Sequence, residues 1–371
     1  MNFEALIGLA VPGVQGLKPY EPGKPIEELQ REYGLTDVVK LASNENPLGC
    51  GALAREAMLQ AVSSIHLYPD GNAFKLKKAL SEHFEFEPNQ ITIGNGSNDL
   101  LEIIGRGFAD GNAEIIYSQH AFAVYYIVTQ ALGARHAVTP AKDWGHDLDA
   151  MAQAITDKTK VIFIANPNNP TGTYLAADQL KAFLDKVPQN VIVVLDEAYH
   201  EFIDKSDYGS ALQWVNDYPN LVVTRTFSKA YGLAGLRIGF SVSHPAVCNV
   251  MNRVRQPFNA NSMALAAAQA ALADEQFIKD TVALNCSGMR QLESAFNRFG
   301  LNYIPSVTNF IAFDVQRNGT EVFQALLAEG VIVRPIGAYQ MPTHLRVSIG
   351  TERENQTFIA ALEKVLARNS E

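Results

Sequence analysis

The chain has 371 residues, of which 47% are hydrophobic and 19% are charged, and this composition excludes an intrinsically disordered protein. Its 30 basic and 39 acidic residues give a formal net charge of −9. A large nucleic-acid surface is therefore unexpected, because phosphate backbones require clustered lysine and arginine.

Three widely spaced cysteines, Cys50, Cys248 and Cys286, fit a reducing compartment better than a disulfide or zinc framework. The N-terminus lacks the basic segment and apolar run of a secretory signal. No stretch reaches the roughly 18 uninterrupted apolar residues of a membrane span. We therefore expect a cytoplasmic protein that acts on small molecules, without a nucleic-acid or membrane partner.

In chain order, residues 1–45 are rich in proline and predict an arm that packs on a smaller domain or on a partner subunit. Residues 46–260 alternate short β-branched runs with helical patterns, which is typical of an α/β domain with a mainly parallel sheet. Residues 261–371 predict a smaller α+β domain. The predicted strands of the large domain are 91–93, 115–117, 161–165, 191–195, 221–224 and 238–242, with a helix over 175–184; those of the small domain are 309–315, 331–335 and 345–349, after a long alanine-rich helical stretch over 262–286.

Polar or glycine-rich clusters follow directly on several of these strands, where an open α/β sheet places its ligand crevice. The first is Gly94-Asn-Gly-Ser-Asn98, which joins a strand to a helix expected to begin near Asp99. Backbone N–H groups at such a helix start can bind phosphate. The loop is weak as a signal by itself, and the dinucleotide fingerprint G-x-G-x-x-G is absent because position 99 is aspartate.

The second cluster is Ala165-Asn-Pro-Asn-Asn169-Pro-Thr-Gly172. Two prolines and a glycine restrict its backbone, so the Asn169 side chain can be a rigid donor. A simple turn would need no function, but the motif is long and specific.

The third cluster is the segment 191–199, Val-Ile-Val-Val-Leu-Asp-Glu-Ala-Tyr. Asp196 follows five apolar residues, and a buried carboxylate is costly unless a cation accompanies it. A protonated pyridine nitrogen would be such a cation, and Tyr199 could bond a phenolate-like oxygen on the same ring. A helix-capping aspartate with a packing tyrosine is an equally good interpretation of this segment alone. A metal site with Glu197, His200 and Glu201 is a weaker one.

The fourth cluster is Thr226-Phe-Ser-Lys229 with Arg237. A lysine at a strand end can be desolvated, which lowers its pKa and makes its amine a nucleophile for a carbonyl. Taken alone, Lys229 is more often a surface lysine. Its neighbours favour a site, because Thr226, Ser228 and Arg237 offer the donors that bind phosphate.

Two arginines of the small-domain strands, Arg334 and Arg346, are either solvated charges or a clamp for a carboxylate or phosphate. Tyr68 and Phe122 are, by themselves, more often turn or core aromatics than cofactor contacts. One lysine, one buried carboxylate, a tyrosine, an asparagine and a phosphate-binding cluster together describe a pyridoxal phosphate site.

On these residues the sequence resembles the fold-type I pyridoxal-phosphate-dependent aminotransferases of class I/II, and among them most closely the histidinol-phosphate aminotransferases. The resemblance spans nearly the whole chain. It rests on residues 41–47, 68–71, 166–172 and 196–199, on Ser228-Lys229 with Arg237, and on residues 345–350.

The resemblance implies a mainly parallel α/β domain with a smaller α+β domain, and a homodimer with shared sites. It implies that Lys229 binds pyridoxal 5′-phosphate covalently and that no metal takes part. The other implied cofactor contacts are Asp196 on the ring nitrogen, Asn169 and Tyr199 on the ring hydroxyl, Phe122 stacked on the ring where tyrosine is common, Thr226, Ser228, Arg237, Ser97 and Asn98 on the phosphate, and Tyr68 of the other subunit. The implied substrate contacts are Arg346, Arg334, Tyr20 and Asn46.

The implied activity is amino exchange between L-histidinol phosphate and 2-oxoglutarate or glutamate, in histidine biosynthesis. Catalysis would involve Lys229, Asp196 and Tyr199, with Lys229 carrying the proton from the substrate's Cα to the cofactor. An aromatic amino-acid aminotransferase is the nearest alternative, followed by threonine-phosphate decarboxylase. A ligand-sensing regulator would need a DNA-binding module, for which neither end has the basic charge, and the missing glycine fingerprint disfavours a nicotinamide oxidoreductase.

Overall fold

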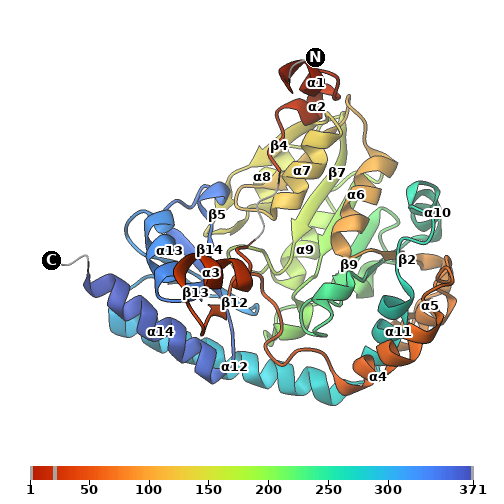
Figure 1. The fold of residues 1–371 in the computed structure, drawn as a ribbon. Coiled ribbons are helices and arrows are strands. Elements are labelled where there is room, and N and C mark those ends of the chain that lie inside the picture. The colour runs from red at the N-terminus through yellow and green to blue at the C-terminus, as the bar shows by residue number, and fades with distance from the viewer. Residues whose placement is uncertain (1–2, 20–22, 369–371) are drawn as a thin grey trace.

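The structure is a computed structural model that describes residues 3–19 and 23–368. A large central sheet with helices on both faces stands beside a smaller sheet, and the long helix α12 (Glu275–Phe299) runs below both (Figure 1). Among the described residues, no helix is both long and apolar enough to span a membrane.

The central sheet has seven strands in the order β2-β10-β9-β8-β7-β3-β4. Strand β10 is antiparallel to both of its neighbours, and the other pairings are parallel, which confirms the predicted α/β class. Each of the six predicted large-domain runs overlaps one of these seven strands, and two of the runs begin one residue before their strand. The strands are β2 (Ile91–Gly94), β3 (Glu114–Ser118), β4 (Arg135–Thr139), β7 (Thr159–Ala165), β8 (Ile192–Asp196), β9 (Leu221–Thr226) and β10 (Gly239–Ser243).

Both faces of the sheet are buried, which explains why its strands are apolar without alternation. Ile162 and Ile164 of β7 belong to the core on one face, and Val161 and Phe163 belong to the core on the other. Helices α4 (Ala52–Ala61), α5 (Phe74–Phe84), α8 (Leu148–Gln153), α9 (Ala177–Leu184) and α11 (Ser262–Ala271) contribute to the first core, and α6 (Ser97–Phe108), α7 (Ala123–Ala131) and α10 (Pro245–Val254) to the second. A short hairpin, β5 (Ala141–Lys142) and β6 (Gly145–His146), precedes α8.

The smaller sheet is antiparallel, in the order β11-β12-β15-β14, and packs against α12, α13 and α14. Its strands are β11 (Tyr303–Ile304), β12 (Phe310–Asp314), β14 (Arg334–Pro335) and β15 (His344–Ser348), and its other two helices are α13 (Gly319–Ala328) and α14 (Glu352–Ala367). The alanine-rich stretch expected to be one long helix is two helices, α11 and α12. The break lies at Asp274, whose side chain accepts the backbone N–H of Phe277 and so begins α12 anew.

The N-terminal arm contacts both parts of the molecule. Helices α1 (Phe3–Ile7) and α2 (Pro12–Gln15) lie beside α7, where Gln130 Nε2 donates to the carbonyl of Gly13 at 2.9 Å. Helix α3 (Ile26–Tyr33) packs through Leu29 on Ile332, and β1 (Val39–Lys40) pairs with β13 (Val331–Ile332). The domain limits at residues 45 and 260 stay a prediction.

Candidate active site

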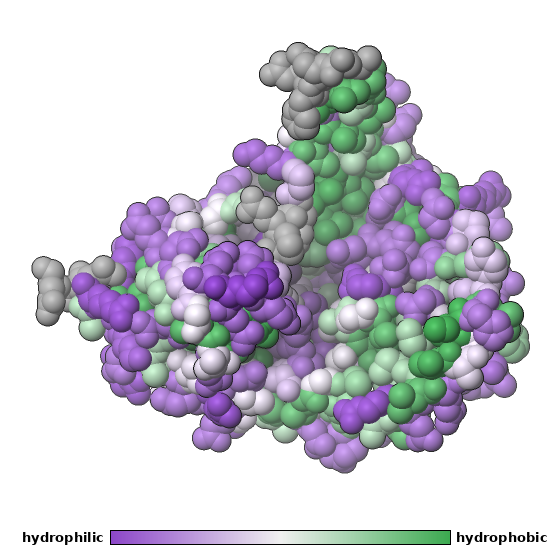
Figure 2. All heavy atoms as spheres, viewed as in Figure 1, coloured by the Kyte–Doolittle hydropathy of each residue, from purple (hydrophilic) through white to green (hydrophobic). Residues whose placement is uncertain are grey.

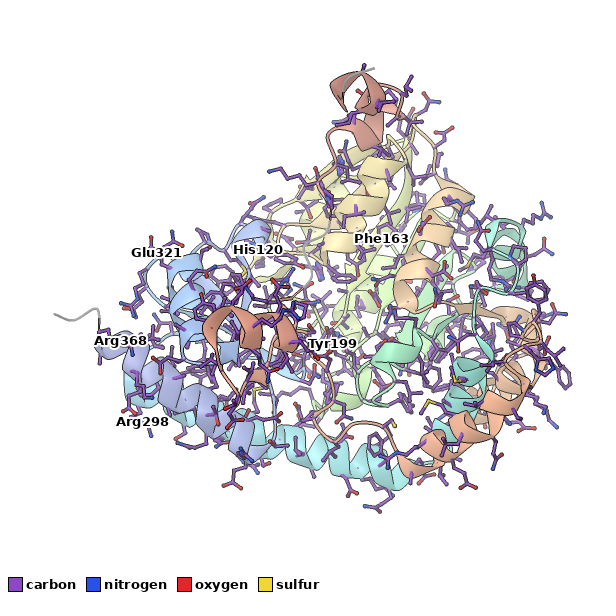
Figure 3. The ribbon with its side chains drawn as sticks, viewed as in Figure 1. His120, Phe163, Tyr199, Arg298, Glu321 and Arg368 are labelled. Atoms are coloured by element: carbon purple, nitrogen blue, oxygen red, sulfur yellow. The ribbon has the colours of Figure 1, made fainter. Side chains whose placement is uncertain are left out.

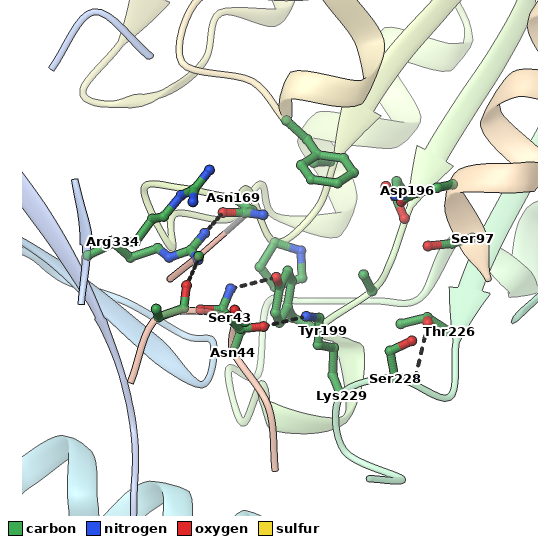
Figure 4. A pocket seen from close by; sticks show the side chains of 18 of the residues that line it. Ser43, Asn44, Ser97, Asn169, Asp196, Tyr199, Thr226, Ser228, Lys229 and Arg334 are labelled. Atoms are coloured by element: carbon green, nitrogen blue, oxygen red, sulfur yellow. Dashed lines mark hydrogen bonds between the residues drawn. The ribbon is translucent and has the colours of Figure 1, made fainter. Parts of the chain in front are cut away.

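A cavity of about 200 Å³ lies between the carboxyl ends of the central strands and the smaller sheet (Figure 4). Strand ends and the loops that follow them supply most of its wall, as expected for an open α/β sheet. Its polar and aromatic lining comprises Ser43, Asn44, Ser97, Asn98, Phe122, Asn169, Asp196, Tyr199, Thr226, Ser228, Lys229, Arg237, Arg334, Tyr339 and Arg346.

Asp196 is the last residue of β8 and is only 4% exposed. Its Oδ1 accepts a hydrogen bond from the Thr224 hydroxyl at 3.0 Å, and its Oδ2 accepts one from the Tyr125 hydroxyl at 3.1 Å. Burial raises the pKa of Asp196 to about 6, although both hydrogen bonds oppose the rise. Asp196 is not a helix cap, because the next helical turn begins at His200 and its cap position is Tyr199.

Lys229 follows the end of β9, and its Nζ donates to the carbonyl of Ser43 at 3.0 Å. Burial lowers the pKa of Lys229 to about 7, and the positive charges of Arg346 and Arg237 act in the same direction. The neutral amine, which is the form that attacks a carbonyl, is therefore much more abundant near pH 7 than for an ordinary lysine.

The hydroxyl of Tyr199 reaches the cavity beside Lys229 (Figures 3 and 4). It accepts from Asn44 Nδ2 at 2.9 Å, and the Oδ1 of Asn44 in turn accepts from Ser348 Oγ at 3.0 Å. Burial raises the pKa of Tyr199 to about 12, so the hydroxyl keeps its proton at neutral pH.

Arg346, on strand β15 of the smaller sheet, lines the cavity. Its guanidinium donates to Asn169 Oδ1 at 2.6 Å and to the carbonyl of Ala42 at 2.8 Å, and it lies over the ring of Phe310. The first bond uses the amide oxygen of Asn169, so its nitrogen is the atom that can donate into the cavity. Arg334, on the neighbouring strand, is paired in register with Arg346 and lines the same cavity.

The opposite end of the cavity is rich in donors. Thr226, Ser228 and Arg237 meet there, with Arg237 Nη1 3.3 Å from Ser228 Oγ. Helix α6 begins beside them at Ser97, two residues earlier than the sequence predicted, because Gly96 adopts a φ of +82° and turns the chain into the helix.

Gly96 also leaves room for the arginine. A Cβ at this position would lie 2.5 Å from Arg237 Nη2, so only glycine allows the guanidinium to reach the helix N-terminus. Within the described chain, no side chain caps α6. The loop, the helix start, two hydroxyls and one arginine together form an anion-binding end of the cavity.

Two of the predicted site residues that the structure describes, Asn46 and Tyr68, do not line this cavity. Asn46 instead donates to the carbonyl of Ala230 and to Thr281. Tyr68 is 83% exposed and stacks on Phe258 at 4.8 Å between ring centroids. Tyr20 lies outside the described residues.

Several residues of the site were missed by the sequence analysis, namely Ser43, Asn44, Tyr125, Thr224 and Tyr339. Two of them carry a local signal. Tyr125 lies three residues after Phe122, and Thr224 lies two residues before Thr226 on the same side of β9, so helix and strand periodicity could have found them. Asn44 and Tyr339 come from segments far from the central strands and carry no such signal.

The carboxylates considered for a metal site have another role. Glu197 and Glu201 both pair with the buried guanidinium of Arg225, at 2.8 and 3.4 Å. Among residues 3–19 and 23–368, no group of three or more His, Cys, Asp or Glu side chains is placed to hold a metal ion.

Comparisons with known proteins agree with this geometry. The family model for aminotransferase class I and II matches residues 36–362. The histidinol-phosphate aminotransferase 1 of Idiomarina loihiensis is 55% identical over 98% of this chain and 99% of that protein, and the histidinol-phosphate aminotransferase 2 of Pseudomonas fluorescens is 56% identical over 98% of both. The crystal structure of histidinol-phosphate aminotransferase from Sinorhizobium meliloti in complex with pyridoxal-5′-phosphate aligns with a TM-score of 0.90 and 29% identity, over 97% of this chain and 98% of that one.

Proposed function

The chain belongs to the class I and II aminotransferases, and from that premise we propose that it transfers an amino group between L-histidinol phosphate and 2-oxoglutarate or glutamate, with pyridoxal phosphate as its cofactor. One observation carries the proposal: Lys229, Asp196 and the arginines Arg334 and Arg346 face a single cavity. Such a cavity offers an amine nucleophile, a carboxylate and binding groups for an anionic substrate.

The residues present fit pyridoxal phosphate. The anion-binding end, with the Gly96 turn, Ser97, Thr226, Ser228 and Arg237, suits its phosphate. Within residues 3–19 and 23–368, the hydrogen-bond donors to the carboxylate of Asp196 are two neutral hydroxyls, and a protonated pyridine nitrogen would supply a cation. Phe122 lines the cavity as a flat apolar surface for the ring.

The chain's own residues divide the work of proton transfer. When bound, pyridoxal phosphate supplies an electron sink for the negative charge that develops at the substrate's Cα. Lys229 Nζ, with a pKa of about 7, is suited to take the proton from Cα and to return it. Asp196 would hold a proton on the ring nitrogen of the cofactor, and the hydroxyl of Tyr199 and the amide of Asn169 would bind its ring oxygen.

The two arginines would bind the anionic group of the substrate. Arg346 is only 6% exposed and is fixed by Asn169 and Ala42, so its guanidinium is already oriented before the substrate arrives. Arg334 adds a second positive charge on the next strand. A doubly charged phosphate profits from two arginines more than a single carboxylate does, and this favours histidinol phosphate over an aromatic amino acid.

The proposal includes a cytoplasmic homodimer in which Tyr68 reaches the partner's cofactor phosphate. Tyr68 is strongly exposed and is surrounded in the sequence by further exposed apolar residues. They include Leu59, Val62, Ile65, Leu67 and Phe74, and Figure 2 shows hydrophobic side chains gathered over this side of the molecule near α4 and α5. An apolar surface of this kind is typical of an interface between subunits. Three free cysteines support a cytoplasmic location, because thiols stay reduced in that compartment.

The test is a substrate panel for the purified protein with 2-oxoglutarate. Histidinol phosphate, phenylalanine, tyrosine and threonine phosphate are compared by kcat/KM, and carbon dioxide release is measured in parallel. We expect histidinol phosphate to be preferred by at least about tenfold. A clear preference for phenylalanine would instead identify an aromatic aminotransferase, and carbon dioxide release from threonine phosphate would identify a decarboxylase.

A further inference from the structure

Tyr125 has no role in the mechanism above, yet it is completely buried beside the site. Its hydroxyl donates to Asp196 Oδ2 at 3.1 Å, from helix α7 to the end of strand β8. Thr224 donates to the other oxygen of the same carboxylate. Both oxygens of Asp196 are therefore held by hydroxyl donors of the chain.

The ring of Tyr125 cannot easily move its hydroxyl away. It stacks on Phe163 of β7 with a centroid distance of 4.8 Å and an interplanar angle of 3°. It also packs edge-on against Phe122, at 5.9 Å and 89°, and lies 6.5 Å from the ring of Tyr117. Tyr125 thus touches both the carboxylate and the aromatic side chain proposed to stack on the cofactor ring.

The bond has a fixed direction. Burial and the neighbouring Asp196 raise the pKa of Tyr125 well above its ordinary value, so the hydroxyl remains a donor throughout the working pH range. A donor stabilises the charged form of the carboxylate, while burial favours the neutral form. The Tyr125 hydroxyl therefore opposes the loss of charge from Asp196.

We propose that Tyr125 is a positioning residue, which fixes the orientation and the negative charge of Asp196 and at the same time sets the tilt of Phe122. The inference rests on the proposed function for the identity of the cofactor. It does not depend on the substrate, because each of these contacts joins two side chains of the chain itself.

The test compares Tyr125→Phe with Tyr126→Phe. The first variant removes the donor and keeps the ring, and the second makes the same change one residue further on, at a half-exposed tyrosine that stacks on His136. Full-length protein prepared without cofactor is labelled with ¹³C-aspartate, and Asp196 is assigned from the signal that Asp196→Asn removes. We expect Tyr125→Phe to raise the pKa of Asp196 by about one unit, and Tyr126→Phe to leave it unchanged.

Two further measurements use the holoenzyme. Cofactor release, followed by its absorbance, should be about three- to tenfold faster in Tyr125→Phe than in the wild type, and kcat should fall about tenfold with little change in KM. Replacement of Tyr125 by 3-fluorotyrosine keeps the shape and strengthens the donor. It should lower the pKa of Asp196, and it provides the test if the phenylalanine variant does not fold.

The proposal is overturned if the pKa of Asp196 and the rate of cofactor release are the same in the wild type and in the Tyr125 variants. These readouts are independent of substrate choice. A protein that binds the cofactor but rejects histidinol phosphate would refute the proposed function and leave this test intact.

Discussion

Asp196 and Glu197 are consecutive carboxylates at the end of β8, and they point into two different regions of the molecule. Glu197 faces the core, where it accepts from the Arg225 guanidinium, from Ser210 and from the backbone of Ala211. Asp196 faces the cavity, where its donors are two neutral hydroxyls. Both side chains are almost completely buried, at 4% and 1% exposure.

The two carboxylates differ in whether a cationic side chain lies beside them. A buried carboxylate with a bidentate-capable arginine is a structural group, and removing either partner leaves an uncompensated charge. Among the ion pairs of the described residues, Glu197 appears with Arg225, whereas Asp196 appears in none. The donors that the structure describes for Asp196 are neutral, and a desolvated carboxylate of this kind is suited to a cation that a ligand brings, as is typical of active-site groups.

The largest effect should come from Lys229 on the cavity side. Lys229→Ala removes the only group proposed to move the proton at Cα, so kcat should fall by about 10⁴-fold or more. The unfolding temperature should change little, and some cofactor should remain bound through the anion-binding end. Activity near that of the wild type would refute the role of Lys229.

Asp196→Ala should have the second-largest effect. It should weaken cofactor retention, and the rate of proton abstraction in single-turnover experiments should fall by about 10²- to 10³-fold. The physical reason is that the ring nitrogen loses its anionic partner and with it the proton that makes the ring an electron sink. Unchanged single-turnover rates would show that the two carboxylates do not differ as described.

Glu197→Gln should mainly affect folding. The neutral amide leaves Arg225 with Glu201, at 3.4 Å, as its one anionic partner in the part of the chain that the structure describes, so the free energy of unfolding should fall by about 3 kcal/mol. Denaturant unfolding followed by circular dichroism measures the loss, and kcat of the folded protein should stay within about threefold of the wild type. A stable variant with kcat reduced by orders of magnitude would show that Glu197 has a catalytic role and not a structural one.

The smallest effect concerns pH. Burial raises the pKa of Asp196 to about 6, above its unfolded value near 3.9, so its contribution to stability is present at low pH and is lost as the pH rises through about 6. In protein without cofactor, Asp196→Asn should therefore stabilise by roughly 2 to 3 kcal/mol at pH 8 and by less than about 1 kcal/mol at pH 4, near the unfolded pKa. Equal effects at both pH values would mean that burial does not disfavour the charged form of Asp196.

The sequence predicted the central sheet well because its signal is local. The runs at 161–165 and 191–195 are apolar without interruption, and only a strand buried on both faces tolerates such a run within a chain that alternates strands and helices. The helix expected near Asp99 begins two residues earlier, and the alanine-rich stretch is divided at Asp274, because both boundaries depend on backbone geometry and capping at single residues.

Several cavity residues named in the sequence analysis stand at or just after strand ends, whereas Tyr125 and Tyr339, which it did not name, lie outside the central strands. Lys229, Asp196 and Thr226 stand at strand ends, which parallel pairing brings to one edge of the sheet. Tyr125 lies within helix α7, and its hydrogen bond to Asp196 joins residues 71 positions apart.

The amino-acid sequence by itself determined the fold class, the family and the chemistry at the strand ends, because hydrophobic periodicity and short motifs act over a few residues. The tertiary structure alone decided which groups share one cavity. Arg346 meets Asn169 across 177 positions, and Ser348 meets Asn44 across 304. It also decided that Asp196 has hydroxyl partners while Glu197 has an arginine, because desolvation and pairing depend on what packs around a side chain, and adjacent residues of a strand face opposite sides.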